Sequence, residues 1–435
     1  RTRKGGKMVT SDIPHALAED KDGTYLAGDN KNSWVGVALL QDLFIREHNW
    51  ICDQIAAEAK AEGKEMTDEE MFGKARVVVS GLVAKIHTTD WTVELLKTKL
   101  LEISMYTNWD GILKAFGIPI PGVLSRMGEN KGKKSDNKGT PFCLTEEFAA
   151  VYRLHSLSPP GLILGEGEFI ELANLVGDKG RKEMRKSEDR PKQMMKSCLH
   201  WPCGALMSSN YPNAFRNVTP TDDYGKELAE TENIDLAALD LFRDRERGIL
   251  KFNEFRRQLN LKPYKTWLEL TRGEERDARR LELIYGPGQE GIERCDLLIG
   301  DMYEGKVQPT FALSETSFII FLLMASRRLD ADPFLNELYN EETYSKVGLK
   351  HVKENKGLID LLERHYPDLA ADFRDKNQSV FKPILPKEAW EKAIEDKVVP
   401  GTLSEEWATT KKRNEEFFDM LEAETEIYTK KLKAN

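Results

Sequence analysis

The sequence predicts a mainly α-helical protein, and two observations lead to this fold class. Apolar residues recur at helical spacing along several long segments, and helix-capping patterns precede some of them. No run of alternating apolar and polar residues convincingly predicts a series of strands. With 435 residues, of which 40% are hydrophobic and 31% charged, the chain can bury a large core and does not have the composition of a disordered protein.

The predicted helices follow from these patterns in chain order. Residues 33–40 lead into a helix over 43–53, and the capping box Thr67-Asp68-Glu69-Glu70 begins a second helix that reaches about Thr88. A helix over residues 146–157 is stopped by Ser158-Pro159-Pro160-Gly161. Further helices are predicted over 236–249, 252–259 and 311–329.

Two segments between these helices have loop-like or strongly charged composition. Residues 125–141 are rich in Gly, Lys, Asn and Ser, which predicts an exposed loop. Residues 181–196 are strongly charged, so we expect them to face solvent.

The C-terminal tail differs from the rest of the chain after about Pro383. A helix is predicted over 387–398, Pro400-Gly401 breaks it, and a capping box at 402–405 begins a final long helix. An apolar stripe on that helix is expected to pack on the main body, with a partner-binding helix as the alternative; it consists of Phe417, Leu421, Tyr428 and Leu432. We therefore expect a main unit over 1–385 and a helical extension over 386–435.

Charge and cysteine content narrow the classes of function. The net charge of −9 argues against general nucleic-acid binding, which needs a basic face. Five widely spaced cysteines without a CxxC pair predict neither a disulfide framework nor a zinc site. The longest apolar run, residues 318–325, is too short to span a bilayer. Because the chain opens on Arg1 and not on Met, its cellular compartment is left open.

Tyr152 and His155 are the most informative pair in the sequence. Residues three apart share a face of a helix, so a metal held by His155 would have the Tyr152 phenol at its edge. Haem iron is commonly held by one histidine, and a nearby tyrosine could pass an electron to it and become a radical. Two packed side chains without a role in chemistry are the alternative, and the spacing alone does not decide between them.

Five segments, taken in order, carry a resemblance to a known family. They are Arg46-Glu47-His48-Asn49, residues 84–96, Tyr152-Arg153-Leu154-His155, residues 244–257 and residues 324–329. Together they resemble the haem peroxidase–cyclooxygenase superfamily, and its fatty-acid α-dioxygenase branch in particular, from about Gly5 to about Leu369. The resemblance implies an animal-type haem peroxidase or cyclooxygenase-like helical fold, truncated at its N-terminus, and makes residues 1–385 a partial catalytic domain.

The resemblance also implies roles around a haem. His155 resembles the proximal ligand of the iron, and Tyr152 resembles the tyrosine that carries the radical. Asn253 and Arg256 resemble a pair in which the amide accepts the proximal imidazole N–H and the guanidinium meets a haem propionate. For Asn253, an ordinary amide on a helix surface is the alternative.

A second set of residues resembles the carboxylate site of the α-dioxygenases. It consists of His87, Thr92 and either Arg327 or Arg328, between which the sequence does not choose. Oxidation beside a carboxyl group requires the head group to be held next to the radical, and an Arg fork, an imidazole and a hydroxyl suit that task. Residues 318–325 either line an acyl channel or form a buried core helix with a basic C-terminal turn.

The remaining histidines are not included in the predicted site. His48 belongs to a segment that is structural in the resembling family. His15, His200, His351 and His365 have no supporting context and are interpreted as ordinary polar residues.

The implied activity is a haem-dependent fatty-acid α-dioxygenase that works through a tyrosyl radical. Its cofactor would be haem b, and its partners a fatty acid, O2 and a hydroperoxide activator. The product would be a 2-hydroperoxy fatty acid, which belongs to oxylipin biosynthesis and to the response to oxidative stress. The alternatives are a haem peroxidase of small donors, a diol-synthase-like or cyclooxygenase-like oxygenase, and an inactive haem-binding fragment.

The sequence departs from the family near its beginning. The family places a distal histidine and a calcium-binding loop before the point where this chain begins, and residues 1–46 hold only His15. We therefore expect either a fragment of a longer enzyme or a truncated relative, and calcium only in a full-length form. Membrane association is left open, with no anchor evident.

Overall fold

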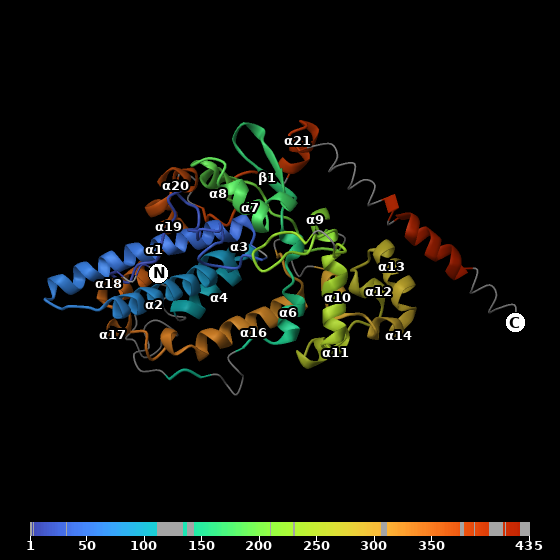
Figure 1. The fold of residues 1–435 in the computed structure, drawn as a ribbon. Helices are drawn as coiled ribbons and strands as arrows, with labels where there is room; N and C mark the ends of the chain where they lie inside the picture. Colours follow the sequence, from blue (N-terminus) through green and yellow to red (C-terminus); the bar gives the residue numbers. More distant parts are fainter. Residues whose placement is uncertain are drawn as a thin grey trace.

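The protein is mainly helical, as the sequence predicts (Figure 1). The computed structural model describes residues 2, 4–31, 33–110, 134–136, 143–208, 210–228, 231–305, 311–374, 378–386, 388–399, 412–413 and 415–426. Within these residues no helix is long and apolar enough to cross a membrane.

The first part of the chain contains two long helices, several short turns and one small sheet. Its elements are α1 (Val35–Ala61), α2 (Asp68–Ile86), the π-helix η1 (His87–Trp91), α3 (Thr92–Leu95), α4 (Lys99–Asp110), α6 (Glu146–Val151), η2 (His155–Leu157), β1 (Gly161–Ile163), η3 (Gly165–Gly167), β2 (Phe169–Glu171), η4 (Leu172–Asn174), α7 (Gly177–Met184) and α8 (Arg190–His200). The strands form an antiparallel hairpin in which Leu162 faces Ile170.

The second part is built from shorter helices around one long one. Its elements are α9 (Asn213–Arg216), α10 (Leu236–Glu246), α11 (Phe252–Gln258), α12 (Trp267–Leu270), α13 (Glu275–Tyr285), α14 (Gly288–Glu293), α15 (Leu297–Tyr303), α16 (Glu315–Ala331), η5 (Pro333–Leu335), α17 (Glu341–Tyr344), α18 (Lys346–Glu354), α19 (Leu358–His365), α20 (Pro367–Arg374) and α21 (Ala389–Glu395).

Helices α1 and α2 pack side by side on α18, although α18 comes more than 250 residues later (Figure 1). Ile51 and Ile55 of α1 meet Val78 and Leu82 of α2 in one buried cluster, and Val352 of α18 completes it. The predicted capping box of α2 is confirmed, because Thr67 and Glu70 exchange hydrogen bonds at its first turn. This three-helix unit supports the turn that follows α2.

A second core lies between α6, α11, α15 and α16. Val151 of α6, Phe252 and Phe255 of α11, Leu297 of α15 and Phe321 of α16 are all buried in it. The sequence predicts helices at α11 and α16 because their apolar residues recur at helical spacing. This packing places the C-terminal end of α6 beside α16.

Of two expectations about the first part of the chain, one is confirmed and one is wrong. The helix predicted over 43–53 lies within α1, which also includes residues 35–40 of the segment that leads into it. The segment 181–196 does not face solvent throughout, because α7 and α8 pack inward and bury Arg181 and Arg190. Glu168 and Glu183 neutralise Arg190, so its charge is no obstacle to burial.

The β1–β2 hairpin is absent from the prediction, because strands of three residues are too short to show an alternating pattern. Of the predicted loop over 125–141, only residues 134–136 belong to the described part of the chain, and they form no regular element.

In the C-terminal region, α21 forms within the predicted range and packs on the hairpin through Ala393 and Ile163. Residues 415–426 are helical and contact α13 through charged groups: Glu415 pairs with Arg276, and Glu422 pairs with Arg279. Phe417 of the predicted stripe is half exposed, so for this residue the packing prediction is wrong. The capping box at 402–405, Tyr428 and Leu432 lie outside the described residues.

Candidate active site

Tyr152 lies at the end of α6, where the helix stops. Thr145 caps the start of α6, and the backbone of Tyr152 leaves the helical region with φ −91° and ψ 26°. Its ring stacks on Phe148, with centroids 4.9 Å apart, and lies parallel to Phe321 at 5.9 Å. Burial raises the pKa of the Tyr152 phenol to about 12, so the hydroxyl keeps its proton at neutral pH.

His155 begins the short turn η2 and does not share a helix with Tyr152, which corrects the expectation of one helix over 146–157. Its Nδ1 lies 2.9 Å from Oδ2 of Asp240, whose side chain is fully buried. Because an ionised carboxylate only accepts hydrogen bonds, Nδ1 must carry the proton, and Nε2 of the neutral ring carries the lone pair. The rings of Tyr211 and Phe215 stand edge-on to the imidazole, each 5.8 Å away.

Asp240 is the functional residue that sequence reasoning missed. Arg153 holds it in place, because Nη1 of Arg153 is 3.0 Å from Asp240 Oδ1 and Nη2 is 3.1 Å from Asp244 Oδ1. The guanidinium thereby ties α10 to the segment between Tyr152 and His155. Two aspartates four residues apart on one helix repel each other, so their spacing could have predicted a basic partner.

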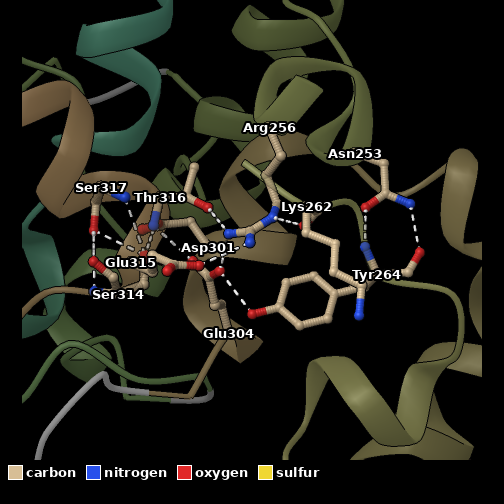
Figure 2. Close-up of polar contacts among 10 residues, drawn as sticks. All are labelled: Asn253, Arg256, Lys262, Tyr264, Asp301, Glu304, Ser314, Glu315, Thr316 and Ser317. Carbon is tan, nitrogen blue, oxygen red and sulfur yellow. Dashed lines mark hydrogen bonds and ion pairs between the residues drawn. The ribbon is translucent and has the colours of Figure 1, made fainter. Parts of the chain in front are cut away.

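The expected contact between Asn253 and the proximal imidazole is wrong, because Asp240 lies on that nitrogen. Asn253 is buried, and its amide nitrogen donates to the carbonyl of Tyr264 (Figure 2). The same nitrogen also donates to Glu293. The backbone N–H of Tyr264 donates to the amide oxygen of Asn253. The amide therefore ties α11 to the segment after it and to α14, and it is not the surface amide of the alternative either.

Arg256 is engaged in a buried network and is only 3% exposed. It pairs with the buried Glu304 and donates to Thr316 and Glu315, each at 2.8 Å, while its Nε donates to the carbonyl of Lys262 at 2.9 Å (Figure 2). These bonds join α11 to α15 and α16. The arrangement gives Arg256 a structural role in place of the expected contact with a propionate.

His87 and Thr92 lie at the two ends of one widened turn. The predicted helix over 68–88 is α-helical only to Ile86, and the π-helix η1 follows. π-helical turns are frequent at functional sites. The imidazole of His87 stacks on Trp91, with centroids 4.9 Å apart, and burial lowers its pKa, which favours the neutral ring. The Thr92 hydroxyl donates to the carbonyl of His87 at 2.7 Å.

Phe321 of α16 brings the two predicted groups of residues together. Its ring is 5.9 Å from that of Tyr152 and 5.9 Å from that of His87, and Trp91 stands edge-on at 6.3 Å. The tyrosine and the histidine, 65 positions apart in the sequence, therefore both contact the same side chain.

The two candidate arginines lie near the end of α16. Seven residues make almost two full helical turns, so Arg328 lies on the same face of α16 as Phe321, whereas Arg327 is turned about 120° away from Phe321. Nη2 of Arg328 is shielded from solvent.

Two histidines interpreted as ordinary polar residues belong to a buried charge cluster. Nε2 of His351 is 2.6 Å and Nε2 of His365 is 2.8 Å from the carboxylate of Glu47, and Arg364 also donates to it. Although burial alone would raise it, the pKa of Glu47 is lowered by these hydrogen bonds and by Arg364. The cluster joins α1 to α18 and α19. His48, interpreted as structural, lies 2.9 Å from the carbonyl of Gly6.

Comparison with known proteins gives consistent matches. The family described as Animal haem peroxidase matches residues 2–377. "Alpha-dioxygenase PIOX" of Oryza sativa subsp. japonica is 42% identical over 88% of this chain and 62% of its own length. The protein of the same name from Pisum sativum is 43% identical over 85% of this chain and 58% of its own.

Solved structures of fatty acid alpha-dioxygenases also match this chain. A tyrosine-to-phenylalanine variant of the Oryza sativa fatty acid alpha-dioxygenase, crystallised with palmitic acid, superposes with a TM-score of 0.77. It is 40% identical, and the match covers 88% of this chain and 64% of the other. The chain thus spans about six-tenths of the length of the relatives that it matches.

Proposed function

This chain belongs to the animal haem peroxidase family, a membership that implies haem binding, and we propose that it is a fatty-acid α-dioxygenase. The observation that carries the proposal is the position of Phe321 against the rings of both Tyr152 and His87. A hydrogen-abstracting group and a carboxylate-binding group must lie this close together if oxidation is to occur next to the carboxyl carbon.

We propose that His155 would hold the haem iron and that the haem would be haem b. The residues fit this role, because the bond from Nδ1 to Asp240 leaves the lone pair on Nε2, as a ligating imidazole requires. When bound, haem supplies the oxidising power that converts a phenol into a phenoxyl radical. Arg153 helps by fixing both Asp240 and the chain between Tyr152 and His155. Calcium in a longer form of the protein is a prediction that stays untested.

His87 and Arg328 are proposed to hold the fatty-acid carboxylate. A neutral imidazole donates one hydrogen bond, and a guanidinium can fork onto both carboxylate oxygens. We choose Arg328 over Arg327 because it lies on the Phe321 face of α16. Thr92 can donate to the carboxylate only after its hydroxyl turns away from the carbonyl of His87.

The proposed reaction is the addition of O2 to the α-carbon. The Tyr152 radical takes a hydrogen atom from that carbon, so the phenol forms again and the substrate becomes a carbon radical. O2 adds to this radical, and the resulting peroxyl group takes a hydrogen atom back from Tyr152. The product is a 2-hydroperoxy fatty acid, and the tyrosyl radical is restored for the next turnover. A hydroperoxide is proposed to start the first cycle.

The test combines a haem absorption spectrum with oxygen uptake on palmitic acid and mass spectrometry of the product. We expect a Soret band, oxygen consumption and a 2-hydroperoxide. A product oxidised deeper in the acyl chain would favour a diol-synthase-like or cyclooxygenase-like enzyme, and oxidation of small donors alone would favour a peroxidase. A protein that binds haem but turns over neither kind of substrate would be the inactive haem-binding fragment.

The division of the chain into two units is also a proposal. We propose a catalytic unit over 1–385 and an extension over 386–435, in which ion pairs hold residues 415–422 to α13 of the catalytic unit.

A further inference from the structure

We propose that Asp90 is a positioning residue of the carboxylate site, because it fixes the π-helical turn at whose ends His87 and Thr92 lie. Asp90 is the fourth of the five residues of η1 and is 8% exposed. The assignment of the turn to a carboxylate site rests on the function proposed above. The role of Asp90 in holding the turn rests on contacts that do not depend on the substrate.

Both carboxylate oxygens of Asp90 accept hydrogen bonds from a distant part of the chain. Oδ2 accepts from the backbone N–H of Leu358 at 2.9 Å, and Oδ1 accepts from the Ser379 hydroxyl. Gly357 is in contact as well, because a side chain there would collide with the Asp90 carboxylate. The side chain thus ties η1 to the beginning of α19 and to the segment after α20.

A π-helical turn needs such support, because π-helices are rare and occur mostly as single turns. Thr88 and Thr89 donate their hydroxyls to the carbonyls of the preceding turn of α2, and such bonds compete with regular helix structure. Lys85, one residue before the end of α2, donates to the carbonyls of Val352 and Lys353. The turn is therefore anchored on both sides of His87: Lys85 holds it to the last turn of α18, and Asp90 holds it to the first residue of α19.

The electrostatics agree with positioning and not with substrate contact. Burial raises the pKa of Asp90, and Glu94 and Asp360 add to this effect, while Ser379 and Leu358 oppose it. The N-terminus of α19 also favours a negative charge at this position. A carboxylate that faced the substrate head group would repel it, and the bonds to Leu358 and Ser379 direct this one elsewhere.

The test compares two substitutions of Asp90 with a matched control. Asp90→Ala removes both bonds, whereas Asp90→Asn can keep both, because its amide oxygen can accept from Leu358 and its amide nitrogen can donate to Ser379. Asp296→Ala is the control, because Asp296 is also buried and holds Arg245 and Lys251 instead.

The first readout does not require activity or haem. The imidazole of His87 is followed by NMR with 13C-labelled histidine, assigned through the loss of one signal in His87→Gln. In Asp90→Ala we expect the pKa of His87 to rise toward its ordinary value and amide exchange over residues 86–92 to become faster. Both should stay at the parent values in Asp90→Asn and Asp296→Ala. Unchanged His87 titration and exchange in Asp90→Ala would overturn the proposal.

The second readout is steady-state oxygen uptake with palmitic acid. We expect kcat/KM of Asp90→Ala to fall on the order of 100-fold, mainly through KM, as for a displaced binding group, with recovery in Asp90→Asn. If kcat/KM fell equally in Asp90→Ala and Asp296→Ala, Asp90 would contribute only to general stability, and the inference would be rejected. If the parent protein does not oxygenate palmitic acid at all, the proposed function fails, whereas the NMR and exchange data still decide the role of Asp90.

Discussion

The radical role proposed for Tyr152 would begin from a neutral phenol, because burial raises the pKa of this side chain to about 12. Its ring contacts the rings of Phe148 and Phe321, and neither of these can accept its proton. In the proposed mechanism, the hydroxyl hydrogen would therefore be lost only when the ring itself is oxidised.

Substitution of Tyr152 by Phe tests this role directly. The change removes only the hydroxyl oxygen and keeps both ring contacts, so the fold and the haem spectrum should be retained. Oxygen uptake on palmitic acid should drop to the background rate. Substitution of Phe148 by Leu is the control, since it alters the packing around Tyr152 but leaves the hydroxyl in place. Oxygenation that persists in Tyr152→Phe would remove the tyrosine from the mechanism.

A second prediction at the residue scale concerns Asp240. Asp240→Ala removes the acceptor from Nδ1 of His155, and loss of such a partner typically costs about 10–100-fold in metal affinity. Haem titration followed at the Soret band measures this loss. Asp244→Ala is the matched control, because Asp244 shares Arg153 but does not contact His155. Equal haem affinity in the two variants would contradict the assignment.

Contacts between individual side chains were the feature that the sequence predicted least well. The pair Tyr152 and His155 drew attention through its spacing, yet the chain leaves the helix between them. Asp240 lies 85 positions from His155, and only the tertiary packing of α10 makes it the imidazole partner. Asn253 has the right chemistry for that contact, but its hydrogen bonds are made with the segment after α11 and with α14.

At the scale of single elements, α16 connects the two parts of the candidate site. Its middle carries Phe321, which contacts the rings of Tyr152 and His87, and its last turns carry the two arginines. Periodicity predicted this helix within a few residues, but the same periodicity did not reveal which arginine shares a face with a residue of the site.

Substitution of each of the two arginines in turn gives a matched pair of variants. Arg328→Leu should raise KM for palmitic acid on the order of 10–100-fold, because a charge-assisted bond to the carboxylate is lost. Arg327→Leu should leave KM within a few-fold of the parent value. Steady-state oxygen uptake measures both, and the opposite ranking would transfer the role to Arg327.

Helix α2 provides a test at the same scale that is independent of function. Thr67 and Glu70 form its capping box, so Thr67→Ala should lower the free energy of unfolding by about 1 kcal/mol. Chemical denaturation measures the change, and Thr67→Ser, which can keep the cap, is the control. The cap was visible in the sequence because its two residues are three positions apart.

At the scale of the whole molecule, Glu47 joins three helices through His351, Arg364 and His365. The folded state holds the pKa of Glu47 below its value in an unfolded chain, so the unfolded chain binds a proton first as the pH falls. The stabilisation is therefore fully present above about pH 5 and is lost as the pH falls through the folded-state pKa.

Glu47→Gln should thus destabilise the protein at neutral pH by about 1–3 kcal/mol and make its stability depend less on pH in the acid range. Unfolding curves between neutral pH and the acid range measure both effects. Glu62→Gln is the control, because Glu62 pairs with two lysines in a more exposed position. A parallel pH profile in Glu47→Gln and the parent would show that other groups set the acid stability.

The mainly helical class and several of the longest helices could be predicted because local patterns encode them. The arrangement of the helices could not be predicted from such patterns. Glu47 and His365 are 318 positions apart, and Asp90 and Leu358 are 268 apart, so no local pattern announces either contact.

These two contacts act at opposite ends of α19: Asp90 bonds its first residue, and Glu47 bonds its last. During synthesis, the turn that begins at His87 would leave the ribosome long before residues 358–379 exist to anchor it. Closing a loop of this length also slows folding, because chain entropy is lost before the contact forms. The π-helical turn of the proposed carboxylate site should therefore be among the last parts of the nascent protein to mature, and a chain released before Ser379 should have the helices α1 and α2 but an unfinished turn at His87.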